Sequence, residues 1–518
     1  MPTPRSNPNY KVYFSDVKIK SIVAKSLDDV DPDEITIDQL PSGKSFNNRI
    51  YYVDIHTKLR SGEESLVCSD ASDTGEDEPL ERITSRRTPA TTSYALKVIG
   101  RGFDARKIQN EIASLLLLEK YCPSMNVPRV LSWSEDGMRV QTRSDPEGSV
   151  SLEEHDHLPI EALRNVTISD QDKDLDMKQG WMLLSRVPGR IIYTEDLEGD
   201  QGTALMMQIA AYVAEWRKTM PRGKAVGNMI LIPQAKAAPP AATLYARSIL
   251  PGTDVYIYGR LTGHVQPSQP LTTHLEYVTH RLKSALRKLE DSEIYDYIRK
   301  PMTDLVHKFM RDTLPQLDIA VPPEKRRMAD CSKAFPDQAE TGEKMMFTHY
   351  DLSPRNVLVT EDDDGKLNVS AILDLEFSGM YPIYEEFANT LVNDAYDWPK
   401  HSYETFIAAL RALEALPAAL GHAGFCCKGV EGDRDYLGEL QRDEVLPFGD
   451  LIFHQVCLVM RVIENVAPWW LKTSCNLTVN ELQKELDGAY ARVERAIKSL
   501  EAMCTTVHCG EEDMEKPT

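Results

Sequence analysis

The chain has 518 residues and a formal net charge of −21. This acidity disfavours nucleic acid and anionic membrane as partners, because binding to phosphate groups requires a basic face. Hydrophobic residues make up 42% of the chain, which is enough for a large core. The length is compatible with two to four compact units or with one bilobal enzyme that carries insertions.

The cysteines and the first residues bear on the cellular compartment. The nine cysteines show no spacing typical of a zinc site, and their odd count favours reduced thiols. The N-terminal sequence MPTPRSNPNYKVYF contains no apolar run, so we expect no signal peptide. No stretch approaches the ~18 apolar residues that are needed to span a bilayer. We therefore expect a cytoplasmic protein.

The first part of the chain is rich in predicted strands. Residues 1–34 are polar and contain prolines, and we expect a loosely packed lead-in. From residue 35 to about residue 59, side chains alternate as they do in strands. Residues 60–92 are acidic and rich in serine and threonine, which predicts a mobile insertion. SYALKVIG then predicts a buried strand, and ARKIQNEIASLLLLEKY predicts a helix that ends near Pro123.

Further strands are predicted by VPRVLSWSEDGMRVQTR and by WMLLSRVPG, which ends at a Pro-Gly break. After residue 200, apolar residues recur mainly at helical spacing. This order predicts an α+β, bilobal fold with a small β-rich N-terminal lobe at 35–185. A large, mostly helical C-terminal lobe follows at 186–503, and residues 504–518 are predicted to form a disordered tail. A ligand would bind in the cleft between the lobes.

The most informative segment is 347–382, FTHYDLSPRNVLVTEDDDGKLNVSAILDLEFSGMYP. His349, Asp351 and Asn356 have the spacing H-x-D-x-x-x-x-N. The residues that follow predict a β-hairpin with an Asp-Gly turn, and the apolar second strand ends at Asp374. The hairpin would therefore return Asp374 to the side of Asn356.

These residue types suit phosphoryl transfer, which needs a carboxylate near the attacking hydroxyl and oxygen ligands for Mg²⁺ beside the triphosphate. Asp351 could orient and deprotonate the hydroxyl, while Asn356 and Asp374 could bind Mg²⁺. The H-x-D-x-x-x-x-N pattern alone arises by chance fairly often, but its combination with the hairpin and the second aspartate is much more specific. For His349 we expect a structural role. Glu376 could reach the metal through water or have a purely structural role.

These segments resemble the catalytic loop and the metal-binding segment of the aminoglycoside phosphotransferase and choline kinase superfamily, particularly its divergent fungal members. The similarity is close at DLSPRN and ILDLEFSGMYP. Tyr350 replaces the usual glycine of H-G-D, and Leu375 replaces the usual aromatic residue. The resemblance implies a protein-kinase-like fold, ATP and Mg²⁺ as cofactors, and transfer of the γ-phosphate to a hydroxyl of a small molecule, with an amine as the less favoured acceptor.

The resemblance also indicates a phosphate-binding lysine. Lys97 lies in an apolar strand, at the position that matches the lysine of the family, and its side chain would either snorkel outward or point toward phosphate. Glu111 in the next helix could hold Lys97 in an ion pair. A favourable charge in the first turn of the helix is the alternative for Glu111, and Glu119 is the competing partner.

The remaining nucleotide contacts are predicted from weaker patterns. Gly43, Ser45 and Asn47 resemble the G-x-x-N turn that covers phosphates in this family, although a plain hairpin turn is the alternative. The adenine edge would bind main-chain groups around Leu184 and Val187, where the chain links the two lobes. Candidate residues for the substrate pocket, each of which has an ordinary structural alternative, are Glu385, Glu386, Asp394, Asp397, Trp398, Trp469 and Trp470.

Three alternative functions remain open at this point. The first is a catalytically inactive, nucleotide-binding protein of the same fold. The second is a protein kinase. The chain lacks the D-F-G motif and a following A-P-E motif, which argues against this alternative. The third is an unrelated helical interaction protein, which would bind no nucleotide.

Overall fold

The computed structural model describes residues 8–9, 12–27, 30–41, 45–56, 91–101, 103–147, 150–151, 179–261, 266–290, 293–317, 345–382, 385–386, 398–415, 459–460 and 479–512. Gly43 and most of the predicted insertion at 60–92 lie outside these ranges.

The N-terminal lobe is built on one antiparallel sheet. Its strands are β1 (Ile35–Gln39), β2 (Asn48–His56), β3 (Thr91–Ile99), β4 (Val130–Ser134), β5 (Arg139–Thr142), β6 (Val150–Ser151) and β7 (Trp181–Ser185), with helices α1 (Asp16–Ser26) and α2 (Arg106–Tyr121) and the short turn η1 (Pro32–Glu34). The strand order is β1-β2-β3-β7-β4-β5-β6. The strands predicted on both sides of the insertion are thus neighbours, and the insertion leaves the sheet between β2 and β3.

The two helices cover opposite faces of this sheet. Leu96 and Val98 of β3 share a core cluster with residues of α1, whereas Ile99 shares a cluster with residues of α2. Side chains alternate between faces along a strand, so Lys97 lies on the α2 face. This alternation brings the lysine to the helix that carries Glu111.

The lead-in predicted for residues 1–34 is wrong for its middle part. Ser15 caps α1, because its hydroxyl accepts a hydrogen bond from the amide of Lys18. Ile19, Ile22 and Val23 are fully buried against the sheet. The helix is short and lies among prolines and charged residues, so the composition concealed its apolar face.

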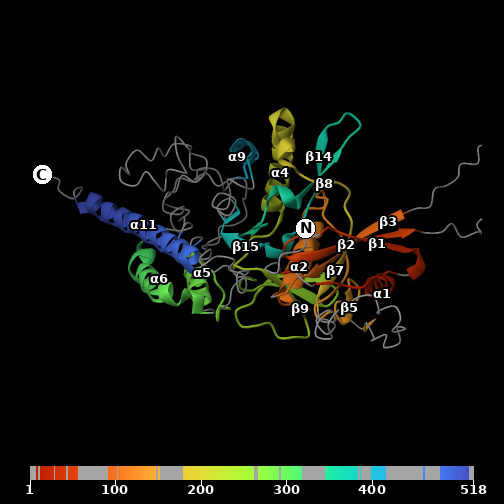
Figure 1. The fold of residues 1–518 in the computed structure, drawn as a ribbon, viewed down its shortest axis with the longest axis horizontal. Helices are drawn as coiled ribbons and strands as arrows, with labels where there is room; N and C mark the ends of the chain where they lie inside the picture. Colours follow the sequence, from red (N-terminus) through yellow and green to blue (C-terminus); the bar gives the residue numbers. More distant parts are fainter. Residues whose placement is uncertain are drawn as a thin grey trace, which may run out of the picture.

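The C-terminal lobe contains most of the helices. Its elements are β8 (Arg190–Ile191), η3 (Thr194–Leu197), α4 (Gly199–Thr219), β9 (Met229–Pro233), β10 (Thr243–Leu250), β11 (Thr253–Ile257), α5 (His274–Lys288), η4 (Glu293–Tyr295), α6 (Asp296–Lys308), η5 (Phe309–Thr313), η6 (Leu314–Gln316), β12 (Met345–Thr348), η7 (Pro354–Asn356), β13 (Val357–Glu361), β14 (Leu367–Ile372), η8 (Leu375–Phe377), β15 (Gly379–Pro382), α9 (Lys400–Ala412) and α11 (Val479–Glu512). Helices α5, α6 and α11 lie at one end of the molecule and the seven-stranded sheet lies at the other (Figure 1). The α+β, bilobal prediction is confirmed.

Two parts of this lobe differ from the prediction. Strands β9–β11 form an additional antiparallel sheet, in the order β10-β11-β9, and β9 packs against α2. The apolar run of β9 is too short for its periodicity to separate strand from helix. In addition, α11 continues to Glu512, so the disordered tail predicted from residue 504 is wrong for most of its length. No proline interrupts the helix, and Gly488 lies within it without ending it.

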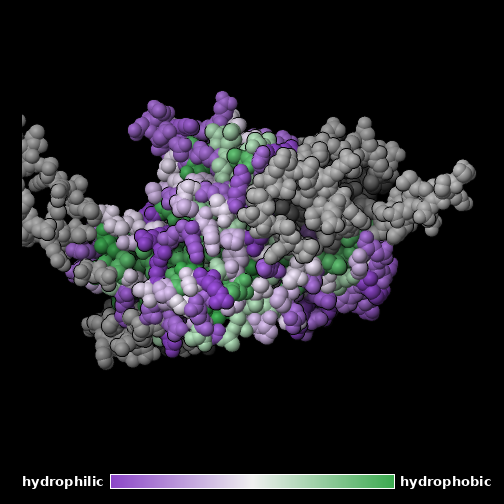
Figure 2. All heavy atoms as spheres, turned by 180° about the vertical axis from the view of Figure 1, so that it is seen from behind, coloured by the Kyte–Doolittle hydropathy of each residue, from purple (hydrophilic) through white to green (hydrophobic). Residues whose placement is uncertain are grey.

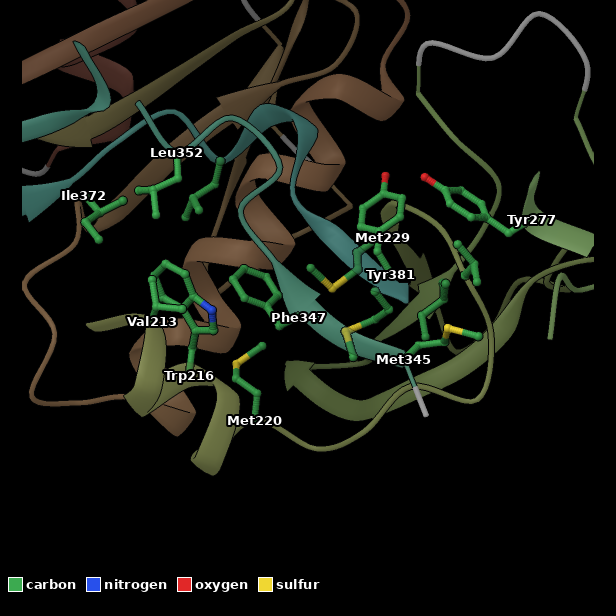
Figure 3. Packing of buried hydrophobic residues seen from close by; sticks show 14 of the residues in the cluster. Val213, Trp216, Met220, Met229, Tyr277, Met345, Phe347, Leu352, Ile372 and Tyr381 are labelled. Carbon is green, nitrogen blue, oxygen red and sulfur yellow. The ribbon is translucent and has the colours of Figure 1, made fainter. Parts of the chain in front are cut away.

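A cluster of aromatic side chains supports the strand that leads to the H-x-D motif. Phe347 of β12 lies against Trp216 of α4, with ring centroids 5.9 Å apart and nearly perpendicular planes (Figure 3). Tyr381 of β15 lies against Tyr277 of α5 at the same distance. Because β12 and β15 pair with each other, this core fixes the chain on both sides of the motif region.

The surface seen from behind in Figure 2 is mostly hydrophilic, with apolar residues in small areas between polar ones. Such scattered apolar residues are normal for a globular protein. In the part of the chain that the structure describes, no helix combines the length and the hydrophobicity needed to cross a bilayer.

Candidate active site

The predicted hairpin places the two segments of the motif side by side. Strands β13 and β14 pair antiparallel from Val357 and Ile372, with one register shift after Leu358. Gly365 in the turn has a φ of 76°, which glycine adopts without steric cost. The amide of Leu373 donates to the carbonyl of Asn356 at 2.8 Å. Asp374 therefore follows directly beside Asn356, as the sequence predicts.

Asp351 is oriented by donors on both of its carboxylate oxygens. Its Oδ1 accepts from Nη2 of Arg355 at 2.7 Å, and its Oδ2 lies 3.2 Å from Nδ2 of Asn356. The side chain is 27% exposed. Burial raises the pKa of Asp351 to about 7, Arg355 opposes the shift, and the charge of Asp374 adds to it. The carboxylate is thus fixed in direction and able to accept a proton near neutral pH.

Asn356 and Asp374 supply the oxygen atoms that suit Mg²⁺. The Nδ2 atom of Asn356 donates to the carbonyl of Asp351 at 2.7 Å, which directs the amide oxygen to the opposite side. Asp374 has left-handed backbone angles, φ 64° and ψ 56°. Such angles are uncommon outside glycine, although aspartate tolerates them, and they concentrate at functional sites. This donor set fits a hard cation such as Mg²⁺.

His349 has the structural role expected from the sequence. It is fully buried, its Nε2 lies 2.8 Å from the carbonyl of Leu373, and its Nδ1 accepts from the amide of Asp351 at 3.3 Å. Nε2 therefore carries the proton. Burial lowers the pKa of His349, which keeps the ring neutral. The ring links the catalytic loop to the strand that precedes Asp374.

The catalytic loop is supported by contacts that the sequence did not reveal. Glu386 is buried and its carboxylate accepts from the amides of His349 at 2.6 Å and Tyr350 at 3.3 Å. Tyr350 has a φ of 73°. Its hydroxyl accepts from Arg260 at 2.7 Å, and its ring centroid lies 4.9 Å from that of Tyr381. The tyrosine that replaces the usual glycine is therefore held by its side chain.

The predicted pocket residues that the structure describes are buried and have structural contacts. Glu385 forms an ion pair with Arg281 at 2.6 Å, and both side chains are 1% exposed. The indole nitrogen of Trp398 donates to the carbonyl of Leu352 at 2.9 Å. Glu386 is committed to the catalytic loop. The other candidates, Asp394, Asp397, Trp469 and Trp470, lie outside the described residues.

Lys97 lies at the centre of three carboxylates. Its Nζ is 2.6 Å from Glu111, 2.6 Å from Asp374 and 3.1 Å from Glu376. The predicted pair with Glu111 is thus present, whereas Glu119 pairs with a surface arginine. Burial lowers the pKa of Lys97, but the carboxylates raise it well above its usual value, so the ammonium remains charged.

These three carboxylates are close enough to bind a metal, since their oxygens lie within 4.8 Å of one another. The ammonium groups of Lys97 and Lys107 already offset part of their charge, however. Glu111 and Glu376 are buried, while the side chain of Asp374 is 28% exposed. Asp374 is therefore the member of the cluster that can reach a metal ion.

Glu376 has protein partners on both oxygens. It accepts from the side-chain amides of Asn47 and Asn48, each at 2.7 Å, and lies 3.2 Å from Nζ of Lys107. Burial raises the pKa of Glu376, but the two lysines and the asparagine donors hold it well below its usual range. Burial lowers the pKa of Lys107 to about 8. Glu376 is therefore a buried anion that joins the lobes.

The remaining predicted nucleotide residues have different surroundings. Ser45 and Asn47 lie in the turn before β2, where Asn47 contacts Glu376, and Gly43 lies outside the described residues. Leu184 lies inside the sheet, between β3 and β4, and the amides of the next two residues donate to neighbouring segments. Val187 follows the strand and is half-buried. Of the two, Val187 is better placed to offer main-chain atoms to a ligand.

Two buried asparagines that the sequence did not single out fix the segment after Asp374. Asn110 of α2 donates to the carbonyl of Glu376 at 2.8 Å and accepts from the amide of Met229 at 2.6 Å. Asn228 donates to the carbonyl of Ser378 at 2.8 Å. Helix α2, the β9–β11 sheet and the segment that follows Asp374 are thereby joined.

The chain is similar to known proteins. A model of the phosphotransferase enzyme family matches residues 81–423, a range that includes Lys97, Asp351 and Asp374. No curated protein matches the chain.

Among solved structures, an ethanolamine kinase of Plasmodium vivax is 10% identical, with a TM-score of 0.40, and the match covers 93% of this chain and 89% of that one. The choline kinase LicA of Streptococcus pneumoniae is 13% identical, with a TM-score of 0.33 and coverages of 93% and 98%. The gentamicin complex of APH(2")-IIa is 10% identical, with a TM-score of 0.42 and coverages of 93% and 96%. These similarities are distant, and the assignment depends on the family model. Because that model spans more than half of the chain, the protein belongs to the phosphotransferase enzyme family.

Proposed function

We propose that this protein transfers the γ-phosphate of ATP, in a Mg²⁺-dependent reaction, to a hydroxyl group of a small molecule. The observation that carries the proposal is the convergence of four residues. Asn356 contacts Asp351 at 2.7 Å, the hairpin returns Asp374 to its side, and Asp374 contacts Lys97 at 2.6 Å. General base, metal ligands and phosphate-binding lysine are thus contiguous.

In this proposal each residue has a separate task. Asp351 accepts the proton of the acceptor hydroxyl as the new bond forms. Asn356 and Asp374 hold Mg²⁺, which would neutralise charge on the phosphates. Lys97 binds phosphate oxygens, and its buried pair with Glu111 keeps the ammonium in position. An amine is the less favoured acceptor.

The turn that contains Gly43, Ser45 and Asn47 would cover the phosphates with its main chain, because the side-chain amide of Asn47 is committed to Glu376. The main chain of Val187 would meet the adenine edge. A cytosolic location, the fungal resemblance and the lack of nucleic acid partners remain predictions from the sequence.

The test is Mg-ATP binding followed by turnover. Thermal unfolding with ATP, in the presence and absence of Mg²⁺, comes first, and then ATP consumption is measured against hydroxylated and amino metabolites. A Mg²⁺-dependent stabilisation and ATP use with one compound class would support the proposal. Stabilisation without turnover on any compound would favour an inactive nucleotide-binding protein, phosphorylation of a protein panel would favour a protein kinase, and no stabilisation would contradict the proposal.

A further inference from the structure

The N-terminal segment touches the turn that is proposed to cover the phosphates. We call residues 45–48 the phosphate loop. The side-chain amide of Asn9 donates to two carbonyls of this loop, that of Ser45 at 2.5 Å and that of Asn48 at 3.0 Å. Asn9 is 2% exposed. One buried side chain thus forms hydrogen bonds at both ends of the loop.

The same segment is fixed to the sheet behind the loop. The amide of Phe14 donates to the hydroxyl of Tyr51 at 2.8 Å, and Phe14 is fully buried. Arg49 of β2 donates to the carbonyls of Val12 at 3.0 Å and Asn9 at 3.3 Å. Asn9 is therefore held in place by the strand that follows the phosphate loop.

A close crossing of three chain segments occurs at Gly100. Its amide donates to the carbonyl of Asn47 at 2.9 Å, and the amide of Arg101 donates to the carbonyl of Pro8 at 2.8 Å. A Cβ atom on Gly100 would lie 2.3 Å from the carbonyl oxygen of Asn47 and 2.8 Å from Pro8. Only glycine allows the N-terminal segment, the phosphate loop and the end of β3 to approach so closely.

The opposite side of the loop is held by the C-terminal lobe, because Glu376 accepts from the side chains of Asn47 and Asn48. Asn9 therefore forms hydrogen bonds to the main-chain carbonyls of the loop, and Glu376 forms hydrogen bonds to its side chains. The side chains of Asn9 and Glu376 are both buried, and a buried hydrogen bond that loses one partner leaves the other unsatisfied at a cost. The position of the loop thus depends on both.

We propose that Asn9 is a positioning residue for the phosphate loop, so that the N-terminal segment is a working part of the nucleotide site. This inference rests on the proposed function, since it requires that the loop covers phosphates. The family match begins at residue 81 and does not include the segment. Asn9 itself would not touch the nucleotide.

The experiment uses the full-length chain and two probes, a non-hydrolysable ATP analogue with Mg²⁺ and adenosine, which has no phosphates. Asn9→Ala removes both hydrogen bonds that the Asn9 side chain donates to the loop. We expect the Kd of the ATP analogue to rise about fivefold, as expected for the loss of one or two hydrogen bonds. The Kd of adenosine, measured by NMR titration, should not change. If Asn9→Ala is too unstable to measure, Asn9→Ser keeps a shorter donor and should give the same pattern.

Ser15→Ala is the matched control, because it removes the cap of α1 in the same segment without touching the loop. It should lower Tm and leave both affinities unchanged. Equal weakening of both probes by Asn9→Ala would mean that Asn9 only maintains the lobe, and unchanged affinity for both would also overturn the inference. A wild-type protein that binds neither probe would overturn the proposed function itself, a result that needs no variant.

Discussion

The proposed phosphate side and the proposed acceptor side of the site are built differently. On the phosphate side, Lys97, Glu111, Lys107 and Glu376 are all less than 10% exposed and bind one another. On the acceptor side, the side chain of Asp351 is 27% exposed and that of Arg355 is 53% exposed. The charged side chains of the first region bind one another, whereas those of the second region are held by the catalytic loop and remain partly exposed.

The difference follows from electrostatics. Buried charges are tolerated only when they are paired and hydrogen-bonded, so the phosphate side has little freedom to vary. A partly exposed carboxylate can exchange a protein donor for a substrate at lower cost. Nucleotide binding should therefore be preorganised, while acceptor specificity should depend on the more exposed side.

The largest effect is expected where the acceptor side performs the chemistry. Asp351→Asn should lower turnover by about 10²–10⁴-fold, the usual contribution of a general base. It should retain binding of the Mg-ATP analogue, because the phosphate side is unchanged. Single-turnover rates and calorimetric titration would measure the two quantities. A parallel loss of binding would show that the two regions are not separable.

Asp374 lies where the two regions meet. Asp374→Ala should weaken binding of the Mg-ATP analogue about tenfold or more, because the site loses its charged metal ligand. It should also lower turnover. Titration with and without Mg²⁺ distinguishes this role, since the Mg²⁺ dependence of binding should largely disappear. Retained Mg²⁺ dependence would contradict the assignment.

Substitution of Glu376 tests how much the buried ion pairs of the phosphate side contribute to the free energy of unfolding. Glu376→Gln leaves Lys107 without its charged buried partner and should lower the free energy of unfolding by about 3 kcal/mol. Glu119→Gln breaks an exposed ion pair on the same lobe and should cost at most about 0.5 kcal/mol. Denaturant unfolding of both variants makes the comparison. Equal stabilities would mean that the buried cluster contributes no more than the surface pair.

The smallest effect is expected for the residue that tunes Asp351. Arg355 lowers the pKa of Asp351, so Arg355→Ala should raise that pKa. The base works only when deprotonated, and turnover is lost as pH falls through its pKa. The acid limb of the pH profile should therefore move to higher pH, by about one unit. Arg355→Lys keeps the charge and should move the limb less, and an unchanged profile in Arg355→Ala would contradict this role.

The sequence predicted what local spacing determines. The alternation in β2, the hairpin after Asn356 and the helix that carries Glu111 all follow from short-range patterns, and the structure has them. The N-terminal helix and the β9–β11 sheet were missed because their apolar runs are short and depend on tertiary partners.

Part of the candidate site was also beyond sequence reasoning. Lys107, Asn48 and Asn9 act through contacts with residues distant in the chain, and each resembles an ordinary surface residue when read alone. The charge of Glu386 makes it a candidate pocket residue in the sequence, with an ordinary structural role as the alternative. Only the fold reveals that it is buried under the catalytic loop.

The packing of α2 has a consequence for control of the enzyme. Protein kinases are commonly switched by moving the helix that carries the glutamate partner of the lysine. Here that helix is enclosed by β9 on one side and η8 on the other, and Asn110 is bonded to both neighbours. An outward swing would break these contacts together. We therefore expect that this enzyme is not switched off by a movement of α2. Its activity would then depend on the supply of its substrates.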